Sequence, residues 1–326
     1  MRCRHMFAVV GSVLILLSGS FSWGKQKQKK QDLRNELVTL QQSTGLSFVS
    51  VGDDGPELIS FADRLWHPLD NSQKTDRFVS GAVSPDGEFL AGHVRSPNSR
   101  ESSPFLTVAR LDGSDSREYR DIKGGGICWS PDKTRLVLTV SVPFQPYLGM
   151  TSLLLLNLAT GETREIQKAV LALAETQCFS PDGLSIVYAI NDSLDIVHPD
   201  TRIFVYDTQK GQTQELTAGE YPTWSPDGKN IAFLKHRNFY VMSPAGNARK
   251  KLFKHVSAHS PLWWSPDSRF VAYKPDCCLW ESIRRKTDIE RFNVLRLEDG
   301  ARDWVVETST FRASFNWIRL APAMKE

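Results

Sequence analysis

The pentapeptide Trp224-Ser225-Pro226-Asp227-Gly228 contains the most informative pattern in the chain, because its central tripeptide recurs. Ser-Pro-Asp occurs five times, with spacings of 46, 50, 45 and 40 residues, at Ser84, Ser130, Ser180, Ser225 and Ser265. An aromatic residue precedes four of the copies, and an apolar run such as Ile231-Ala232-Phe233 follows each of them. Repeats of this length are typical of β-propeller blades.

A second turn signal keeps the same period. In each unit a strand-like run ends in a turn that contains glycine, at Gly113, Gly161, Gly211, Gly246 and Gly300. Each unit therefore predicts a strand, the Ser-Pro-Asp turn, a strand, a loop, a strand, the Gly turn and a strand. Four antiparallel strands make one propeller blade, so we expect an all-β fold.

The Ser-Pro-Asp turns account for their aspartates without a catalytic role. Pro sets φ at the second position of a tight turn, Asp accepts hydrogen bonds from backbone N–H groups, and Gly adopts the positive φ at the exit. Five carboxylates also suit metal ligands, but in a propeller each lies in a different blade. We therefore predict structural turn roles for Asp86, Asp132, Asp182, Asp227 and Asp267.

The two ends of the chain predict one further blade. Residues 46–51 and 57–61 flank a Gly turn and suggest the third and fourth strands of a blade. Residues 314–317 resemble the strand before Ser-Pro-Asp, with Trp317 in the aromatic position. The expected fold is a six-bladed β-propeller of four-stranded antiparallel blades, with the last blade closed by N- and C-terminal strands so that no edge is open.

Three segments do not fit the repeat. Within residues 25–45, Leu33, Leu37 and Leu40 fall at helical spacing, whereas residues 36–42 also suit the missing second strand of the split blade. Insertions occur at residues 62–76 and 275–290. Long propeller loops lie at the rims and often carry function.

The first 24 residues have the layout of a secretory signal peptide. Arg2 and Arg4 precede an apolar run at residues 7–17, and small and polar residues follow. This run is shorter than the roughly 17–25 residues of a membrane-spanning helix, so we expect cleavage and a periplasmic or secreted protein with no stable membrane span. The predicted organisation is a signal peptide at 1–24, a basic and polar segment at 25–45, a propeller at 46–320 and a tail at 321–326.

Composition limits the class of partner. Hydrophobic residues make up 40% of the chain, enough to bury a core. Lys and Arg number 40 against 37 Asp and Glu, a balance too even for a nucleic-acid binder. We expect a monomer whose partner is not a nucleic acid.

These repeats resemble the TolB-like family of six-bladed β-propellers in bacterial cell envelopes, also described as PD40 or WD40-like repeats. The resemblance covers residues 46–320 and rests on the Ser-Pro-Asp units quoted above. TolB carries a separate α/β domain ahead of its propeller, and residues 25–45 are too few to form one, so we expect that domain to be lacking. The same repeat builds the propellers of prolyl oligopeptidase-type peptidases and of oligogalacturonate lyases.

The sequence shows no established catalytic motif. It contains no Gly-x-Ser-x-Gly elbow, Gly-rich phosphate loop, His-Glu-x-x-His or Cys-x-x-Cys motif, so we predict no catalytic residue, cofactor or metal site. Six histidines follow the leader, and we expect them to be scattered over the surface: His67, His93, His198, His236, His255 and His259.

The insertion at residues 275–290 carries the candidate partner-binding residues Trp280, Arg284 and Arg285, because Trp and Arg are common at interface hot spots. In an oxidising compartment, Cys277 and Cys278 suit a vicinal disulfide or bonds to other cysteines. Elsewhere, Cys128 and Cys178 occupy equivalent positions in two blades and are expected to be small buried residues.

Two functions fit this sequence. The first is an exported binding module or scaffold that docks a protein or glycan partner in the cell envelope, without catalysis. The second is a propeller hydrolase or lyase that acts on a polysaccharide through a metal or acid–base site in the funnel. The missing catalytic motifs favour the first.

Overall fold

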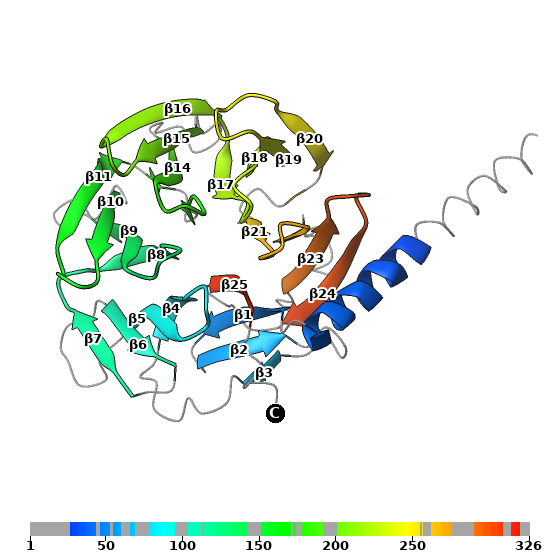
Figure 1. Cartoon of the computed structure of the whole chain (residues 1–326), viewed down its shortest axis with the longest axis horizontal. Helices are drawn as coiled ribbons and strands as arrows, with labels where there is room; N and C mark the ends of the chain where they lie inside the picture. Colours follow the sequence, from blue (N-terminus) through cyan, green and yellow to red (C-terminus); the bar gives the residue numbers. More distant parts are fainter. Residues whose placement is uncertain are drawn as a thin grey trace, which may run out of the picture.

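A computed structural model describes residues 27–43, 46–52, 55–59, 66–68, 78–94, 104–111, 114–141, 151–170, 172–173, 178–191, 201–254, 256, 262–275, 290–308 and 314–319. Its strands form antiparallel sheets around a common centre (Figure 1), so the fold is an all-β propeller. Within these residues, five sheets contain four strands and one contains five.

Five of the sheets follow the predicted unit, and we number them blades 1 to 5 along the chain. Their strands are β4 (Phe78–Val83), β5 (Phe89–Val94), β6 (Phe105–Arg110) and β7 (Ser116–Tyr119) in blade 1; β8 (Gly124–Trp129), β9 (Arg135–Ser141), β10 (Thr151–Asn157) and β11 (Thr163–Val170) in blade 2; β12 (Ala172–Leu173), β13 (Cys178–Phe179), β14 (Ser185–Asn191), β15 (Thr201–Asp207) and β16 (Gln212–Ala218) in blade 3; β17 (Glu220–Trp224), β18 (Ile231–Lys235), β19 (Asn238–Met242) and β20 (Lys250–Lys254) in blade 4; and β21 (Leu262–Trp264), β22 (Phe270–Tyr273), β23 (Glu290–Arg296) and β24 (Arg302–Thr308) in blade 5. Blade 3 departs from the pattern, because β12 and β13 both pair with β14.

The remaining sheet, which we call the closing sheet, joins the two ends of the chain. Its order is β25 (Ser314–Arg319), β1 (Leu46–Gly52), β2 (Gly55–Ile59) and β3 (Trp66–Pro68). Strand β25 is innermost, as expected, and pairs with β1 from Leu46↔Arg319 to Val51↔Ser314 (Figure 1).

The prediction for the N-terminal strands of the closing sheet was wrong by one place in the strand order. Because β1 pairs directly with β25, it is the second strand of the sheet and not the third. The fourth strand is β3, which lies inside the segment interpreted as an insertion at residues 62–76. No second strand is needed from residues 36–42.

Those residues belong to a helix over residues 27–43, so the helical interpretation is confirmed and the strand interpretation is wrong. Leu33 and Leu37 are 0% and 2% exposed and pack in one cluster with Phe270 and Phe292 of blade 5. Two leucines four positions apart lie on one helix face, and their burial against blade 5 stabilises the helix. Leu40 packs against the same cluster. Among the described residues, no helix has the length and apolar character needed to cross a membrane.

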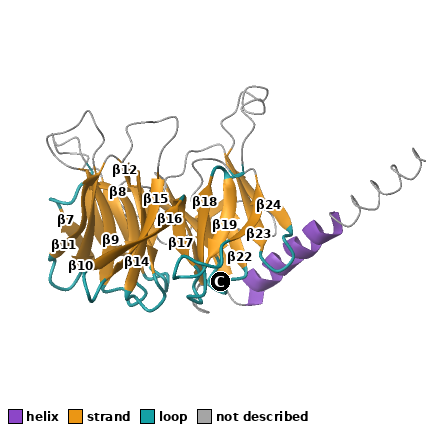
Figure 2. Cartoon of the chain, turned by 90° about the horizontal axis from the view of Figure 1, so that it is seen from above, coloured by secondary structure: helices purple, strands orange, loops and turns teal. Residues whose placement is uncertain are grey.

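Ion pairs attach this helix to the turns of blade 5. Glu36 pairs with both Arg269 and Arg296, and Arg296 Nη1 donates to Glu36 Oε2 at 2.6 Å. Lys29 Nζ lies 3.5 Å from Asp299 Oδ2. Hydrogen bonds from Arg296 hold the pKa of the Asp299 carboxyl below its usual range. Figure 2 shows the helix on the side of the ring where most of the described turns gather.

The core lies between neighbouring blades. Blades 1 and 2 share a cluster that contains Leu106 and Leu136, and similar clusters join the later blades. The aromatic residues before Ser-Pro-Asp are buried in these clusters, at Trp129, Phe179, Trp224 and Trp264. Trp129 Nε1 donates to the carbonyl of Ala82 at 2.7 Å, and Trp264 Nε1 to that of Thr223 at 3.3 Å. These indoles therefore bond to the inner strand of the preceding blade.

Candidate functional site

The five Ser-Pro-Asp turns share one hydrogen-bond pattern. In each, the serine hydroxyl donates to Oδ1 of the aspartate at 2.5–2.6 Å. The same hydroxyl accepts the backbone N–H five residues later at 2.9 Å. Oδ1 also accepts the N–H two residues after the aspartate, at 2.9–3.2 Å. One carboxylate oxygen in every turn is thus engaged in holding the hairpin.

The residue after each aspartate adopts a positive φ, whether or not it is glycine. The angles are 78° at Gly87, 60° at Lys133, 70° at Gly183, 72° at Gly228 and 60° at Ser268. The sequence predicts a positive φ only in the three copies in which glycine follows the aspartate, at Gly87, Gly183 and Gly228. Because a bulky side chain disfavours this conformation, the hydrogen bonds of the turn must outweigh the strain at Lys133 and Ser268.

Side chains at these turns connect neighbouring blades. Lys133 of blade 2 forms an ion pair with Asp86 of blade 1. The hydroxyl of Ser268 in blade 5 accepts the N–H of Asp227 in blade 4 at 3.0 Å. Both side chains at strained positions therefore reach back to the aspartate of the preceding blade.

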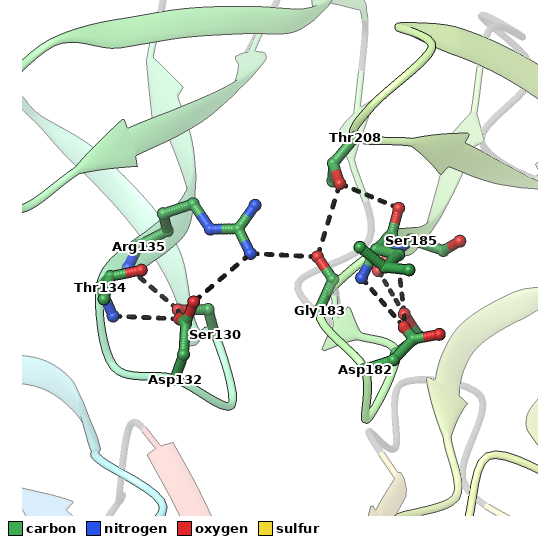
Figure 3. A network of polar contacts seen from close by, with 10 residues as sticks. Ser130, Asp132, Thr134, Arg135, Asp182, Gly183, Ser185 and Thr208 are labelled. Carbon is green, nitrogen blue, oxygen red and sulfur yellow. Dashed lines mark hydrogen bonds and ion pairs between the residues drawn. The ribbon is translucent and has the colours of Figure 1, made fainter.

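A third connection joins blades 2 and 3 (Figure 3). Arg135 Nη2 donates to the carbonyl of Gly183 at 3.1 Å and lies 3.7 Å from Asp132 Oδ2. Thr208 Oγ1 donates to the carbonyl of Leu184 at 2.9 Å, on the other side of the same turn. Side chains thus link the turns of blades 1 and 2, of blades 2 and 3, and of blades 4 and 5 on one face of the ring.

The electrostatics of four of the turns favour ionised carboxylates. The hydrogen bond from Ser180 and the N–H of Leu184 lower the pKa of Asp182. For Asp86, burial opposes ionisation, but hydrogen bonds from Lys133 and Ser84 outweigh it and lower the pKa. Hydrogen bonds outweigh burial in the same way and lower the pKa of Asp132 and Asp227. A carboxylate kept ionised by donors in its own turn acts as a structural acceptor.

The predicted partner-binding and disulfide residues lie outside the described residues and stay predictions: Trp280, Arg284, Arg285, Cys277 and Cys278. Strand β22 runs from its Ser-Pro-Asp turn toward the opposite face of the ring, and β23 returns from that face.

One histidine was interpreted wrongly. His93 in β5 is 2% exposed, whereas it was expected at the surface, and burial lowers its pKa to about 4. His236 is exposed, as expected, in the turn between β18 and β19. The described residues contain no group of three or more His, Cys, Asp or Glu side chains placed to hold a metal ion.

Cys128 is less buried than predicted. It is a free thiol, half-buried, and lies in the inner strand β8 with its Sγ 3.7 Å from the carbonyl of Trp129. Cys178 is described only through its backbone, in β13.

Sequence reasoning missed the residues that connect blades, Lys133, Arg135 and Ser268. It also missed a basic edge on blade 4, described below. The sequence does not indicate these contacts, because the partners are backbone groups or residues in a neighbouring blade, more than forty positions away.

Comparison with known proteins supports the propeller. A family model described as the dipeptidyl peptidase IV (DPP IV) N-terminal region matches residues 180–254, from the turn of blade 3 to the end of β20. TolB from Acinetobacter baumannii superimposes with a TM-score of 0.60 at 16% identity, covering 83% of this chain and 66% of TolB. The chain therefore has a β-propeller fold similar to that of TolB, and its residues 180–254 resemble the DPP IV N-terminal region.

Other relatives agree on the fold. An oligogalacturonate lyase in complex with manganese gives a TM-score of 0.53 at 17% identity, covering 79% of this chain and 72% of the lyase. The uncharacterized peptidase YuxL of Bacillus subtilis is 28% identical over 144 residues, 40% of this chain and 22% of that protein. Dipeptidyl peptidase 4 of Felis catus is 28% identical over 118 residues, 29% of this chain and 15% of that protein. The chain spans less than a quarter of these two curated relatives.

Proposed function

We propose that this chain is an exported propeller that docks an envelope or secreted protein, or a glycan, and catalyses nothing. The hydrogen-bond pattern common to the five Ser-Pro-Asp turns carries the proposal. It commits the repeated carboxylates to holding blades, which suits a rigid scaffold that presents its rims and funnel to a partner. Likeness to TolB supports the scaffold and assigns no ligand.

Several finer features belong to this proposal. The ring has six blades, the sixth being the closing sheet. Residues 1–24 are removed on export, and the mature protein is a monomer in the periplasm or outside the cell. Trp280, Arg284 and Arg285 contribute to the contact with the partner.

A pull-down from envelope extracts, with protein that lacks residues 1–24, tests the proposal. We expect one partner to be retained, and retained at least about tenfold more weakly after Trp280, Arg284 and Arg285 are replaced by Ala, with an unchanged melting temperature. The matched control, Asp182→Ala, should lower the melting temperature and leave capture intact. Turnover of a polysaccharide by the purified protein would contradict the proposal, as would a native N-terminus at Met1.

The match over residues 180–254 favours a second candidate, a propeller that acts together with a peptidase. In that case the retained partner is a peptidase, and the pulled-down fraction should hydrolyse a fluorescent casein substrate. Capture of a partner without peptidase activity would leave the first candidate alone.

A further inference from the structure

Blade 4 and the segment after it differ in charge from the rest of the chain. Residues 228–266 contain seven Lys or Arg and no Asp or Glu, although the whole chain has 40 basic and 37 acidic residues. The seven are Lys229, Lys235, Arg237, Arg249, Lys250, Lys251 and Lys254. Such local separation of charge in a balanced chain indicates a surface that attracts anions.

Three of these lysines lie on β20, the outer strand of blade 4. Among the described strands, the sheet order β17-β18-β19-β20 leaves one side of β20 without a neighbour, and Figure 1 places β20 on the outer margin of the ring. Lys250, Lys251 and Lys254 are all exposed. The other outer strands that carry Lys or Arg, namely β7, β11 and β24, also carry Asp or Glu, and β16 carries Glu215.

The hairpin turn between β18 and β19 adds to the same end of the blade. Lys235 pairs with Asn238, and Asn238 with Lys254, so the three residues form one row across the sheet. His236 and Arg237 form the turn above this row, both exposed and both with positive φ, 49° and 60°.

Hydrogen bonds hold this turn in one conformation. Asn238 Nδ2 donates to the carbonyls of Lys235 at 3.1 Å and His236 at 2.9 Å, and the N–H of Val256 donates to the carbonyl of Arg237 at 3.2 Å. Two bulky residues at consecutive positive φ values are costly in a two-residue turn, which usually contains Asn or Gly. Strained backbone conformations cluster at ligand-binding sites, and this strained turn carries the exposed side chain of Arg237.

Four basic side chains of this edge have no acidic partner in the described part of the chain. Among the described residues, no carboxylate forms an ion pair with Lys235, His236, Lys250 or Lys254. We propose that the outer edge of blade 4, formed by β20 and the turn at residues 235–238, binds an acidic polypeptide segment in an extended conformation. This inference rests on the proposed docking function and names a site and a partner class for it.

An extended peptide fits the edge better than another polyanion. The free edge of β20 presents backbone N–H and C=O groups in strand register, and a polypeptide has the complementary groups at that spacing. Acidic side chains on the added strand would lie near the exposed lysines and near Arg237, which gives charge complementarity. Lysine on an edge strand also discourages pairing with uncharged strands, so only an acidic strand is admitted.

Fluorescence anisotropy with a labelled octapeptide of alternating Glu and Val tests this inference on the purified protein. We expect saturable binding that weakens as salt is raised and falls at least tenfold in the double variant Lys250→Glu, Lys254→Glu. The matched control is Lys168→Glu with Lys210→Glu, the same change in charge at exposed lysines of blades 2 and 3, which should bind like the parent. Melting curves of both variants should match that of the parent protein.

A second peptide separates edge pairing from simple charge attraction. The same octapeptide with alternate residues N-methylated keeps its charge and loses donors to the edge, so it should bind at least tenfold more weakly. Equal binding of both peptides would overturn the inference, and so would a preference for heparin or anionic phospholipid vesicles over the peptide. If the envelope partner is still captured by the Lys250→Glu, Lys254→Glu variant, the edge site fails and the proposed docking function stands. If no partner is captured but the peptide binds as described, the edge site stands and the proposed docking function fails.

Discussion

Blades 1 to 5 and the closing sheet are held together by different means. Each of the five blades contains a Ser-Pro-Asp turn whose shared hydrogen-bond pattern joins residues no more than five positions apart. The closing sheet instead pairs Leu46 with Arg319, and the helix before it attaches to blade 5. Local contacts therefore form regular blades, whereas closure of the ring depends on contacts between the two ends of the chain.

The largest test of this difference is removal of the C-terminal strand. Deletion of residues 310–326 removes β25 and leaves β1 as an open edge facing the centre of the ring. We expect a loss comparable to the whole stability of a typical domain, about 5–15 kcal/mol, seen as loss of the cooperative melting transition. A truncated protein that melts like the full chain would show that the closing sheet does not hold the ring.

The helix over residues 27–43 offers a smaller test of the same region. Leu33→Ala and Leu37→Ala each remove a side chain buried against blade 5, and each should cost about 2–5 kcal/mol in denaturant unfolding. Thr39→Ala, on the exposed face, is the control and should change stability by less than about 0.5 kcal/mol. Equal effects for Leu33 and Thr39 would argue against helix docking.

Acid should destabilise the protein through His93 in blade 1. Burial lowers the pKa of His93 to about 4 from 6.5, so the unfolded state takes up a proton first as pH falls. The stability contributed by the neutral ring is complete above pH 6.5 and is lost as pH falls toward 4, by about 2 kcal/mol between pH 7 and 5. Unfolding free energies of His93→Gln should lack this slope, whereas those of the exposed control His236→Gln should keep it.

The smallest effects concern the exits of the Ser-Pro-Asp turns. A Cβ at Gly87 would meet no atom within 4 Å, so Gly87→Ala tests the cost of the positive φ alone. We expect the free energy of unfolding to fall by about 1 kcal/mol. Conversely, Lys133→Gly should be more stable than Lys133→Ala by about 1 kcal/mol, because both lose the ion pair with Asp86 and only glycine relieves the strain. Equal melting temperatures for the two Lys133 variants would mean that the turn stores no strain.

The blades could be predicted because their signals are local. Ser, Pro, Asp and the exit residue lie within four positions, so the turn and the strands on either side follow from one short pattern. The positive φ at Lys133 and Ser268 could not be predicted, since neither residue type indicates it. The exposure of His93 was predicted wrongly because β5 is the second of four strands in its blade and is buried along its length, so the polarity of a side chain does not predict its exposure there.

The closing region was harder to predict because its partners are remote in sequence. Glu36 meets Arg269 and Arg296, which are 233 and 260 positions away. Helical spacing of Leu33 and Leu37 suggested a helix but not the blade it covers. The order of the strands in the closing sheet likewise depends on the pairing of β1 with β25. The spacing of apolar residues does not show which distant strand pairs with β1. The basic edge of blade 4 was visible in sequence as an acid-free stretch, but its meaning depends on β20 being an outer strand.

The pairing of β1 with β25 has a consequence for how the protein is made. A ribosome synthesises the helix and β1 early, but their partners, blade 5 and β25, come from the last third of the chain. Until those residues emerge, Leu33, Leu37 and the edge of β1 have no native surface to cover them. Contacts this distant slow folding and lengthen the exposure of aggregation-prone edges. The nascent chain should therefore depend on a holding chaperone until its final strand is released.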